Sequence, residues 1–265
     1  MSLCSSDDKI TINDYECPIV TSEMLSEKIA WMTVKCPELA SSVVPGHCVM
    51  IFPSNSLDPL LGRPFGVCDL DRAKGEISVC YMLYGKGTDM MAKMPVGEKI
   101  RVRGPFGVPL PLRENKKIYL TAGGVGIAIF LLYNKLFPKV VAGLYLGIPG
   151  KGYERYSERI LKIAPNAKIF TDDGSFGVGD SMFKVLPKNI GPDEEVWACG
   201  PTGFLKALKT HCSSSLDKLY FSLDKRMACG YGGCMGCVVE TNSGSKRRCV
   251  DESLFRADEV ASYGL

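Results

Sequence analysis

Residues 227–237 read Met-Ala-Cys-Gly-Tyr-Gly-Gly-Cys-Met-Gly-Cys, so three cysteines follow one another with the spacing C-x4-C-x2-C. A fourth cysteine, Cys249, follows after eleven further residues. Four glycines separate the first three cysteines. Glycine adopts positive φ at little cost and lets backbone N–H groups point at a bound anionic group. The stretch therefore predicts a loop that wraps around a bound group held by cysteine thiolates.

The spacing of the four cysteines favours an iron–sulfur cluster as the bound group. Four thiolates in this arrangement are the ligand set of a plant-type 2Fe–2S cluster. The alternatives are a zinc site, a disulfide pair or buried cysteines, but zinc ribbons usually pair two C-x2-C knuckles and this chain has one. His47 and His211 lie far from the loop, which argues against a cluster with two histidine ligands. The predicted iron ligands are Cys229, Cys234, Cys237 and Cys249. A structural zinc protein is kept as the alternative of another class.

The bulk composition is globular and narrows the cellular context. The chain has 265 residues, 46% hydrophobic and 23% charged, with a net charge of +3. That charge is too small to predict a nucleic-acid or acidic-membrane partner. Residues 1–10 lack the hydrophobic segment of a signal peptide, so twelve cysteines suggest a reducing cytoplasm. The uncharged run 118–133 is shorter than the roughly 20 residues that span a bilayer, and we expect no membrane span.

Residues 10–112 favour strands. Glycine or proline recurs about every ten residues between short segments of strand-forming residues. The segments expected to be strands are 28–34, 47–52, 76–84 and 99–103. Only 88–94 has a helical pattern here. This is typical of an antiparallel barrel or sandwich.

From about residue 113 strands alternate with helices. The expected strands are 118–120, 140–146, 168–170, 195–198 and 218–222, and the expected helices are the segment ending at 137, 153–164, 181–186 and 204–211. This alternation predicts a parallel sheet with helices on both faces. The last forty or so residues are too few to form a core and are expected to fold around their metal. We expect three domains, at 1–112, 113–222 and 223–265.

Several turns are candidate anion sites. Residues 122–126 (Ala-Gly-Gly-Val-Gly) and 199–203 (Cys-Gly-Pro-Thr-Gly) each join a predicted parallel strand to a helix, whose N-terminus attracts phosphate. In the first half, Arg63 follows Gly62 and precedes a proline, and its planar fork suits a pyrophosphate. The segment 81–88 ends a strand and begins a helix. Taken alone, each of these motifs also has a purely structural explanation. A glycine turn can be a tight turn, Cys199 a buried cysteine and Arg63 a surface arginine.

In this order the motifs resemble the ferredoxin–NADP reductase superfamily, in which an FAD-binding barrel precedes a nicotinamide-binding domain. The segments 171–177, 197–204 and 226–237 narrow the resemblance to the electron-transfer subunits of class 1B dihydroorotate dehydrogenase. It covers about residues 10–260. The fold that it implies is a β-barrel, a Rossmann-like α/β domain and a small 2Fe–2S module.

The resemblance also implies binding residues. For FAD they are Arg63, Pro64, Phe65, Gly66, Cys80, Tyr81, Met82, Gly87 and Thr88. Those that border NAD are Gly123, Gly124, Gly126, Cys199, Gly200, Pro201 and Thr202. NADP is less favoured, although the segment after the second strand offers Lys151 and Arg155 and no clear carboxylate for a ribose. No acid, base or nucleophile of this chain is implied in catalysis.

The implied function is electron transfer in pyrimidine (UMP) biosynthesis. NADH delivers two electrons at once and the cluster accepts one at a time, so FAD is expected to stand between them. The implied partner is an FMN-containing catalytic subunit that oxidises dihydroorotate to orotate, in a heterotetramer with two copies of each chain. The alternative is a paralogous FAD/2Fe–2S NAD(P)H reductase that serves ferredoxin or another dehydrogenase.

The chain departs from the family pattern at three places. Gly66 stands where serine is usual, Ile129 replaces a proline after the glycine-rich turn, and 251–255 read Asp-Glu-Ser-Leu-Phe instead of Asp-Gly-Pro-Val-Phe. A basic run, Lys246-Arg247-Arg248, directly precedes Cys249. It is explained either as a solvated turn or as a segment that docks the catalytic subunit or raises the reduction potential of the cluster.

Overall fold

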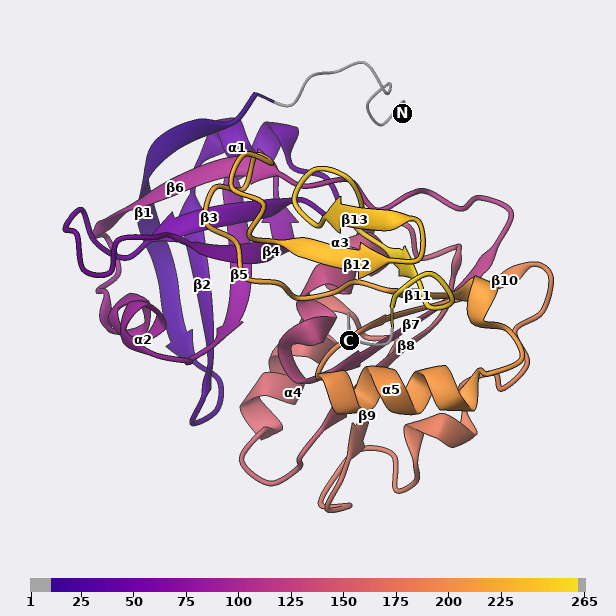
Figure 1. The fold of residues 1–265 in the computed structure, drawn as a ribbon. Helices are drawn as coiled ribbons and strands as arrows, with labels where there is room; N and C mark the ends of the chain where they lie inside the picture. Colours follow the sequence, from indigo (N-terminus) through magenta and orange to yellow (C-terminus); the bar gives the residue numbers. More distant parts are fainter. Residues whose placement is uncertain (1–10, 262–265) are drawn as a thin grey trace.

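The first half of the chain forms a closed barrel of antiparallel strands in the order β1-β2-β5-β4-β3-β6, in the computed structural model, which describes residues 11–261 (Figure 1). The strands are β1 (Asn13–Met24), β2 (Ile29–Lys35), β3 (Cys48–Phe52), β4 (Arg63–Asp71), β5 (Glu76–Met82) and β6 (Lys99–Phe106). Two helices accompany them, α1 (Pro37–Ser42) and α2 (Lys86–Lys93). The predicted antiparallel barrel is confirmed. The sequence pattern did not reveal β1, β4 or α1.

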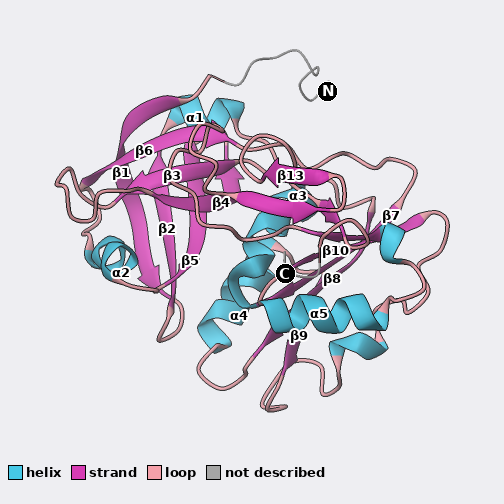
Figure 2. Ribbon diagram, in the orientation of Figure 1, coloured by secondary structure: helices cyan, strands magenta, loops and turns pink. Residues whose placement is uncertain are grey.

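The second half forms a six-stranded sheet in the order β14-β11-β10-β7-β8-β9. The strands are β7 (Lys117–Gly123), β8 (Val141–Ile148), β9 (Ala167–Thr171), β10 (Glu194–Cys199), β11 (Leu219–Phe221) and β14 (Phe255–Arg256). All pairs are parallel except β11 with β14. The helices are α3 (Ala128–Leu136), α4 (Glu154–Ile163) and α5 (Thr202–His211), with short 3-10 turns at Gly124–Ile127, Met182–Lys184 and Leu216–Lys218 (Figure 2).

Helices cover both faces of this sheet, as the alternation predicts. Leu120 and Leu144 belong to a core that also contains Phe130 of α3 and Ile160 of α4. The opposite core contains Val196 and Ala198 of β10 with Leu205 and Leu208 of α5. Strand residues thus alternate between two buried faces, which is why the central segments of these strands are mostly apolar.

The C-terminal part connects the barrel and the sheet. A hairpin of β12 (Val238–Thr241) and β13 (Gly244–Arg247) follows the cysteine-rich loop, and β14 then joins the edge of the six-stranded sheet. In Figure 1 this yellow segment lies across the junction of the two larger parts. The domain boundaries expected from the sequence stay a prediction. Within residues 11–261, no helix is long and apolar enough to cross a membrane.

Candidate cofactor-binding site

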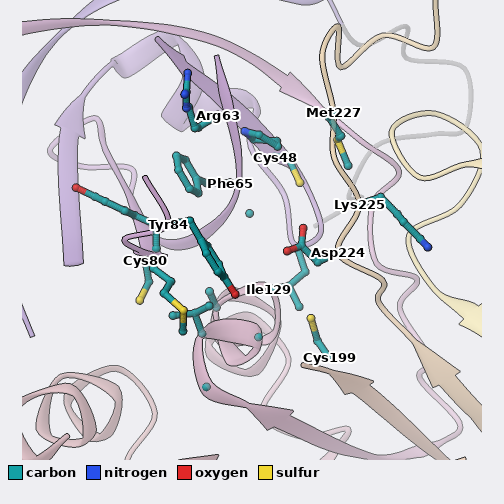
Figure 3. A pocket seen from close by; sticks show the side chains of 18 of the residues that line it. Cys48, Arg63, Phe65, Cys80, Tyr84, Ile129, Cys199, Asp224, Lys225 and Met227 are labelled. Carbon is teal, nitrogen blue, oxygen red and sulfur yellow. The ribbon is translucent and has the colours of Figure 1, made fainter. Parts of the chain in front are cut away.

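A cavity of about 640 Å³ lies between the barrel and the sheet, a size typical of ligand sites. Of the residues expected to bind FAD or NAD, all but Thr202 line it. Those from the barrel are Arg63, Pro64, Phe65, Gly66, Cys80, Tyr81, Met82, Gly87 and Thr88, and those from the sheet are Gly123, Gly124, Gly126, Cys199, Gly200 and Pro201. Thr202 begins α5 and is exposed. Figure 3 shows Arg63 and Phe65 on the barrel side and Cys199 across from them.

Arg63 lies against the N-terminus of α2. A side chain at Gly87 would place its Cβ 2.2 Å from Arg63 Cζ, so the guanidinium lies directly against the glycine. Thr88 Oγ1 accepts the backbone N–H of Tyr84 at 2.9 Å, and this fixes the turn before the helix. A guanidinium beside free helical N–H groups is a suitable site for a pyrophosphate.

The two glycine turns of the sheet meet at one place. Ala122 at the end of β7 pairs in register with Cys199 at the end of β10, so the turns that follow are neighbours. A Cβ at Gly126 would lie 2.5 Å from the carbonyl oxygen of Cys199. The glycines therefore permit a close approach of two backbones, and a flat ring or a phosphate can reach the main chain there.

Tyr156 of α4 links this turn to the barrel, and no sequence motif predicted this role. Its hydroxyl donates to the carbonyl oxygen of Gly124 at 3.0 Å, and the thiol of Cys80 hydrogen-bonds to the same hydroxyl. Burial raises the pKa of Cys80 to about 12. Burial also raises the pKa of Tyr156, so both groups stay neutral and serve as hydrogen-bond partners.

Other residues of the cavity wall were also not predicted. They are chiefly Cys48 of β3 and Ser222, Asp224 and Arg248 of the C-terminal part. Burial raises the pKa of Cys199 to about 12. Desolvation likewise raises the pKa of Asp224, while Arg248 acts in the opposite direction. Figure 3 shows Cys48, Asp224 and Cys199 along one side of the cavity. Their separation in sequence explains why no motif revealed them.

The four predicted iron ligands form two pairs. Cys237 Sγ and Cys249 Sγ are 3.2 Å apart and buried, and we call them the inner pair. Cys229 and Cys234, the outer pair, hydrogen-bond to each other through their side chains and are partly exposed and exposed, respectively. In residues 11–261 no three His, Cys, Asp or Glu side chains gather closely enough for one metal ion. Two separate pairs suit a cluster with two irons better than a single zinc ion.

The backbone of the loop is arranged for thiolates. Burial tends to raise the pKa of Cys229, but hydrogen bonds from the backbone of Tyr231, Cys234 and Gly233 and from the Cys234 thiol outweigh it and lower the pKa to about 7. The N–H of Gly236 lies 3.4 Å from Cys234 Sγ. Gly230 and Gly232 have φ of 79° and 86°, as the glycine-rich sequence predicts. The loop thus fits the predicted cluster in its donor atoms and in its main chain.

The inner pair packs on the barrel. Cys237 and Cys249 share a buried cluster with Cys48, Met50 and Phe106. Cys48 also lines the cavity, so this buried cluster extends from the wall of the cavity to the inner thiols. A Cβ at Gly230 would lie 3.3 Å from the Phe106 ring, which shows how closely the loop meets the barrel.

The three basic residues before Cys249 lie in three different environments. Lys246 forms an ion pair with Glu252 at 2.5 Å, and Arg247 forms one with Asp251 at 2.8 Å. Arg247 also donates to the carbonyl oxygen of Gly232. Arg248 is buried, with 4% of its surface exposed. The run is therefore not the uniformly solvated turn that the sequence allowed.

The segment after Cys249 turns inward. Ser253 is buried and its hydroxyl donates to the carbonyl oxygen of Pro109 at 3.3 Å. Leu254 packs against the core beneath α3, and Phe255 is buried in the sheet. Two of the three departing residues, Ser253 and Leu254, therefore pack against the interior, while Glu252 is partly exposed.

Comparisons with known proteins agree with this geometry. Residues 224–261 match the family model of the iron–sulfur cluster binding domain of dihydroorotate dehydrogenase B. A homolog of the NAD(+) dihydroorotate dehydrogenase B electron transfer subunit from Aquifex aeolicus is 34% identical, over 91% of this chain and 96% of the relative. The corresponding subunit of Bacillus pumilus is 32% identical, over 92% and 96%.

Solved structures share the fold. An NADH-dependent reduced ferredoxin–NADP oxidoreductase, studied for flavin-based electron bifurcation, is 25% identical over 93% of this chain and 90% of its own, with a TM-score of 0.79. Phthalate dioxygenase reductase, described as a modular structure for electron transfer from pyridine nucleotides to [2Fe-2S], matches over 97% of both chains with a TM-score of 0.62 at 15% identity.

Proposed function

Because this chain belongs to the family of dihydroorotate dehydrogenase B electron transfer subunits, we propose that it carries electrons between NAD and an FMN-containing catalytic subunit that oxidises dihydroorotate to orotate in UMP biosynthesis. FAD exchanges electron pairs with NAD and single electrons with a 2Fe–2S cluster when both are bound. The chain itself supplies the positions of these groups. None of its side chains is assigned an acid, base or nucleophile role.

Each wall of the cavity has a separate task in this proposal. Arg63 and the N-terminus of α2 hold the FAD pyrophosphate, and strand β5 borders the flavin ring through Cys80 to Met82. The turns at Gly123–Gly126 and at Cys199–Pro201 receive the nicotinamide nucleotide. Tyr156 keeps the first turn in place by its hydrogen bond to Gly124.

The observation that carries the proposal is the position of Cys48. It lines the cavity and shares a buried cluster of side chains with Cys237 and Cys249, so this cluster connects the wall of the cavity with the inner pair of thiols. The outer pair is more exposed than the inner pair. This arrangement of cavity, inner pair and outer pair supports an electron path from the cavity through the inner pair to the outer pair and then to a partner protein.

The expected assembly is a heterotetramer with two copies of each subunit, working in the cytoplasm. The names of the relatives support the existence of a catalytic subunit. Tyr231, Met235 and Val250 are exposed around the cluster loop, with 58%, 53% and 38% of their surfaces accessible. Exposed apolar side chains beside an electron-transfer group suit a protein interface.

Co-expression with the FMN-containing subunit tests this function. The expected result is a brown-yellow complex with FAD, FMN, iron and acid-labile sulfide that reduces NAD with dihydroorotate. Omitting this chain should remove NAD-linked oxidation while the FMN subunit still accepts electrons from dihydroorotate. A colourless chain containing stoichiometric zinc would contradict the proposal.

A second candidate function has one observation in its favour. The ferredoxin–NADP oxidoreductase structure covers most of this chain with a TM-score of 0.79, so the same architecture also serves a reductase that acts on ferredoxin. Rapid NAD(P)H-dependent reduction of ferredoxin, together with no activity toward dihydroorotate in the co-expressed complex, would favour this reductase. Comparing kcat/KM for NADH and NADPH would then identify the nucleotide.

A further inference from the structure

Arg248 is a buried cation at the wall of the cavity. It lies directly before the cluster ligand Cys249 in sequence, yet it lines the cavity together with Gly66 and Cys80 of the barrel. Only 4% of its surface is exposed. The C-terminal part therefore contributes a positive charge to a site formed mainly by the other two parts of the chain.

This charge is poorly compensated. Arg248 Nη2 donates to Ser222 Oγ at 3.3 Å, while Nη1 is buried and has no hydrogen-bond partner in residues 11–261. Ion pairs hold its neighbours Lys246 and Arg247, but none of the ion pairs found in the described chain includes Arg248. A buried charge without a counter-ion is costly, so it indicates that a negative charge is added to this region when the site is filled.

Asp224 does not supply that charge fully. It lines the same cavity and interacts electrostatically with Arg248, but the ion pairs found in residues 11–261 include none between the two. Desolvation raises the pKa of this carboxyl in spite of the opposing effect of Arg248, so Asp224 is a weak counter-ion for the guanidinium. The charge of Arg248 also acts on the thiols of Cys48 and Cys199, where it opposes the rise in pKa that burial causes. The cavity therefore keeps an excess of positive potential beside these two residues.

We propose that Arg248 compensates the negative charge that the flavin gains on reduction, and so raises the reduction potential of the flavin. This inference rests on the proposed function, which places FAD in the cavity. A flavin ring becomes more negative on reduction, whereas an oxidised nicotinamide ring is positive and would be repelled by a buried guanidinium. The flavin is therefore the better match among the two dinucleotides. Arg248 is therefore a positioning residue. Its charge acts on the flavin electrostatically, through space, and the side chain forms no bond to the cofactor.

The neighbouring arginine serves a different group. Arg247 donates to the cluster loop at Gly232 and interacts electrostatically with Cys249 and Cys237. Its charge is balanced by Asp251. In this proposal the two adjacent arginines influence different electron carriers. Arg247 acts on the cluster and Arg248 acts on the flavin.

The test uses the isolated holoprotein and three variants. Arg248→Met removes the charge at similar volume, Arg248→Lys keeps it, and Lys246→Met makes the same change of net charge outside the cavity. In Arg248→Met the reduction equilibrium of the flavin should shift at least tenfold toward the oxidised form, about 30 mV for a two-electron couple. Arg248→Lys should retain most of the wild-type potential, and Lys246→Met should match wild type.

Affinity and stability separate this role from a merely structural one. Arg248→Met should weaken binding of reduced FAD at least tenfold more than binding of oxidised FAD, since the two affinities and the potential are thermodynamically linked. The flavin-free variant should unfold at no lower temperature than wild type, because an uncompensated buried charge has been replaced by an apolar side chain. Equal losses of both affinities, or a fall in flavin-free stability, would show a structural role and overturn the proposal.

Two further outcomes would also overturn it. If only the Kd of NAD+ changes, the charge serves the nicotinamide nucleotide, and if only the cluster potential shifts, it serves the cluster. None of these measurements needs the catalytic subunit. A chain that shows the Arg248 effect but no dihydroorotate activity in the co-expressed complex would leave this inference standing while the proposed function fails.

Discussion

A Cβ atom on Gly66 would lie 3.0 Å from Cδ1 of Ile129, so these two residues, 63 positions apart, meet at the wall of the cavity. Gly66 stands where the family usually has serine, and Ile129 where it usually has proline. The two departures therefore occur in contact with each other. The side chain of Ile129, at the start of α3, occupies the space beside Gly66 into which a side chain at position 66 would project.

This contact predicts coupling between the two positions. Gly66→Ser should destabilise the protein by about 1–3 kcal/mol, because the new side chain crowds Ile129. In an Ile129→Ala background the same change should cost less than about 1 kcal/mol. A double-mutant cycle on urea unfolding of the flavin-free protein measures the coupling. Strictly additive effects would show that the two departures are independent.

Gly87 should be as important as Arg63 for the affinity of the protein for FAD. Gly87→Ala places a methyl group 2.2 Å from Arg63 Cζ and must displace the guanidinium. We expect FAD affinity to fall at least tenfold, as in Arg63→Ala, with the barrel still folded. Fluorescence titration of the apoprotein with FAD gives the Kd. Gly179→Ala is the matched control, since no atom lies within 4 Å of its added Cβ, and its affinity should equal that of wild type.

Tyr156→Phe should weaken nicotinamide binding and leave FAD in place. The variant loses the hydrogen bond to Gly124 at 3.0 Å and leaves a half-buried carbonyl without this partner. Such a loss costs about 1–3 kcal/mol, and the glycine turn is expected to move. The KM for NADH should rise about tenfold or more while the flavin content stays stoichiometric. An unchanged KM would mean that other contacts hold the turn.

Single cysteine variants should separate the cluster from the flavin. Cys229→Ser and Cys234→Ser remove ligands of the outer pair, which is not part of the buried core, so the protein should fold, bind FAD and lack the normal cluster. Absorbance and acid-labile sulfide measure the loss. Cys212→Ser is the control, because this buried thiol contacts the carbonyl oxygen of Pro187 and a hydroxyl can do the same. A cluster that survives both outer-pair variants would contradict the ligand assignment.

The exposed apolar residues beside the loop predict the docking surface. Tyr231→Glu should weaken association with the catalytic subunit at least tenfold, since a charge is placed in an interface built around Tyr231, Met235 and Val250. Surface plasmon resonance measures the Kd, and the cluster spectrum of the variant should be that of wild type. Leu161→Glu on α4 makes the same kind of change elsewhere and should bind normally. Equal losses in both variants would point to a general loss of stability.

The sequence predicted the elements well where the signal is local. Segment 99–103 is part of β6, and 153–164 contains α4. The antiparallel barrel and the parallel sheet follow from such patterns. Strand β4 was missed because Arg63 and Pro64 at its start read as a turn, and α1 was missed because it has only six residues. Tertiary pairing with β3 and β5 makes β4 a strand in spite of its glycine and proline.

What the sequence by itself determined is the chemistry of the two kinds of site. Cysteine spacing predicts a ligand set, and glycine turns predict where phosphates approach, because both depend on a few consecutive residues. The tertiary structure alone decided which distant residues share the cavity. Cys48, Tyr156 and Arg248 reach it from three different parts of the chain, and sheet register and burial determine that meeting. A run of three basic residues therefore became two surface ion pairs and one buried charge only when the chain folded.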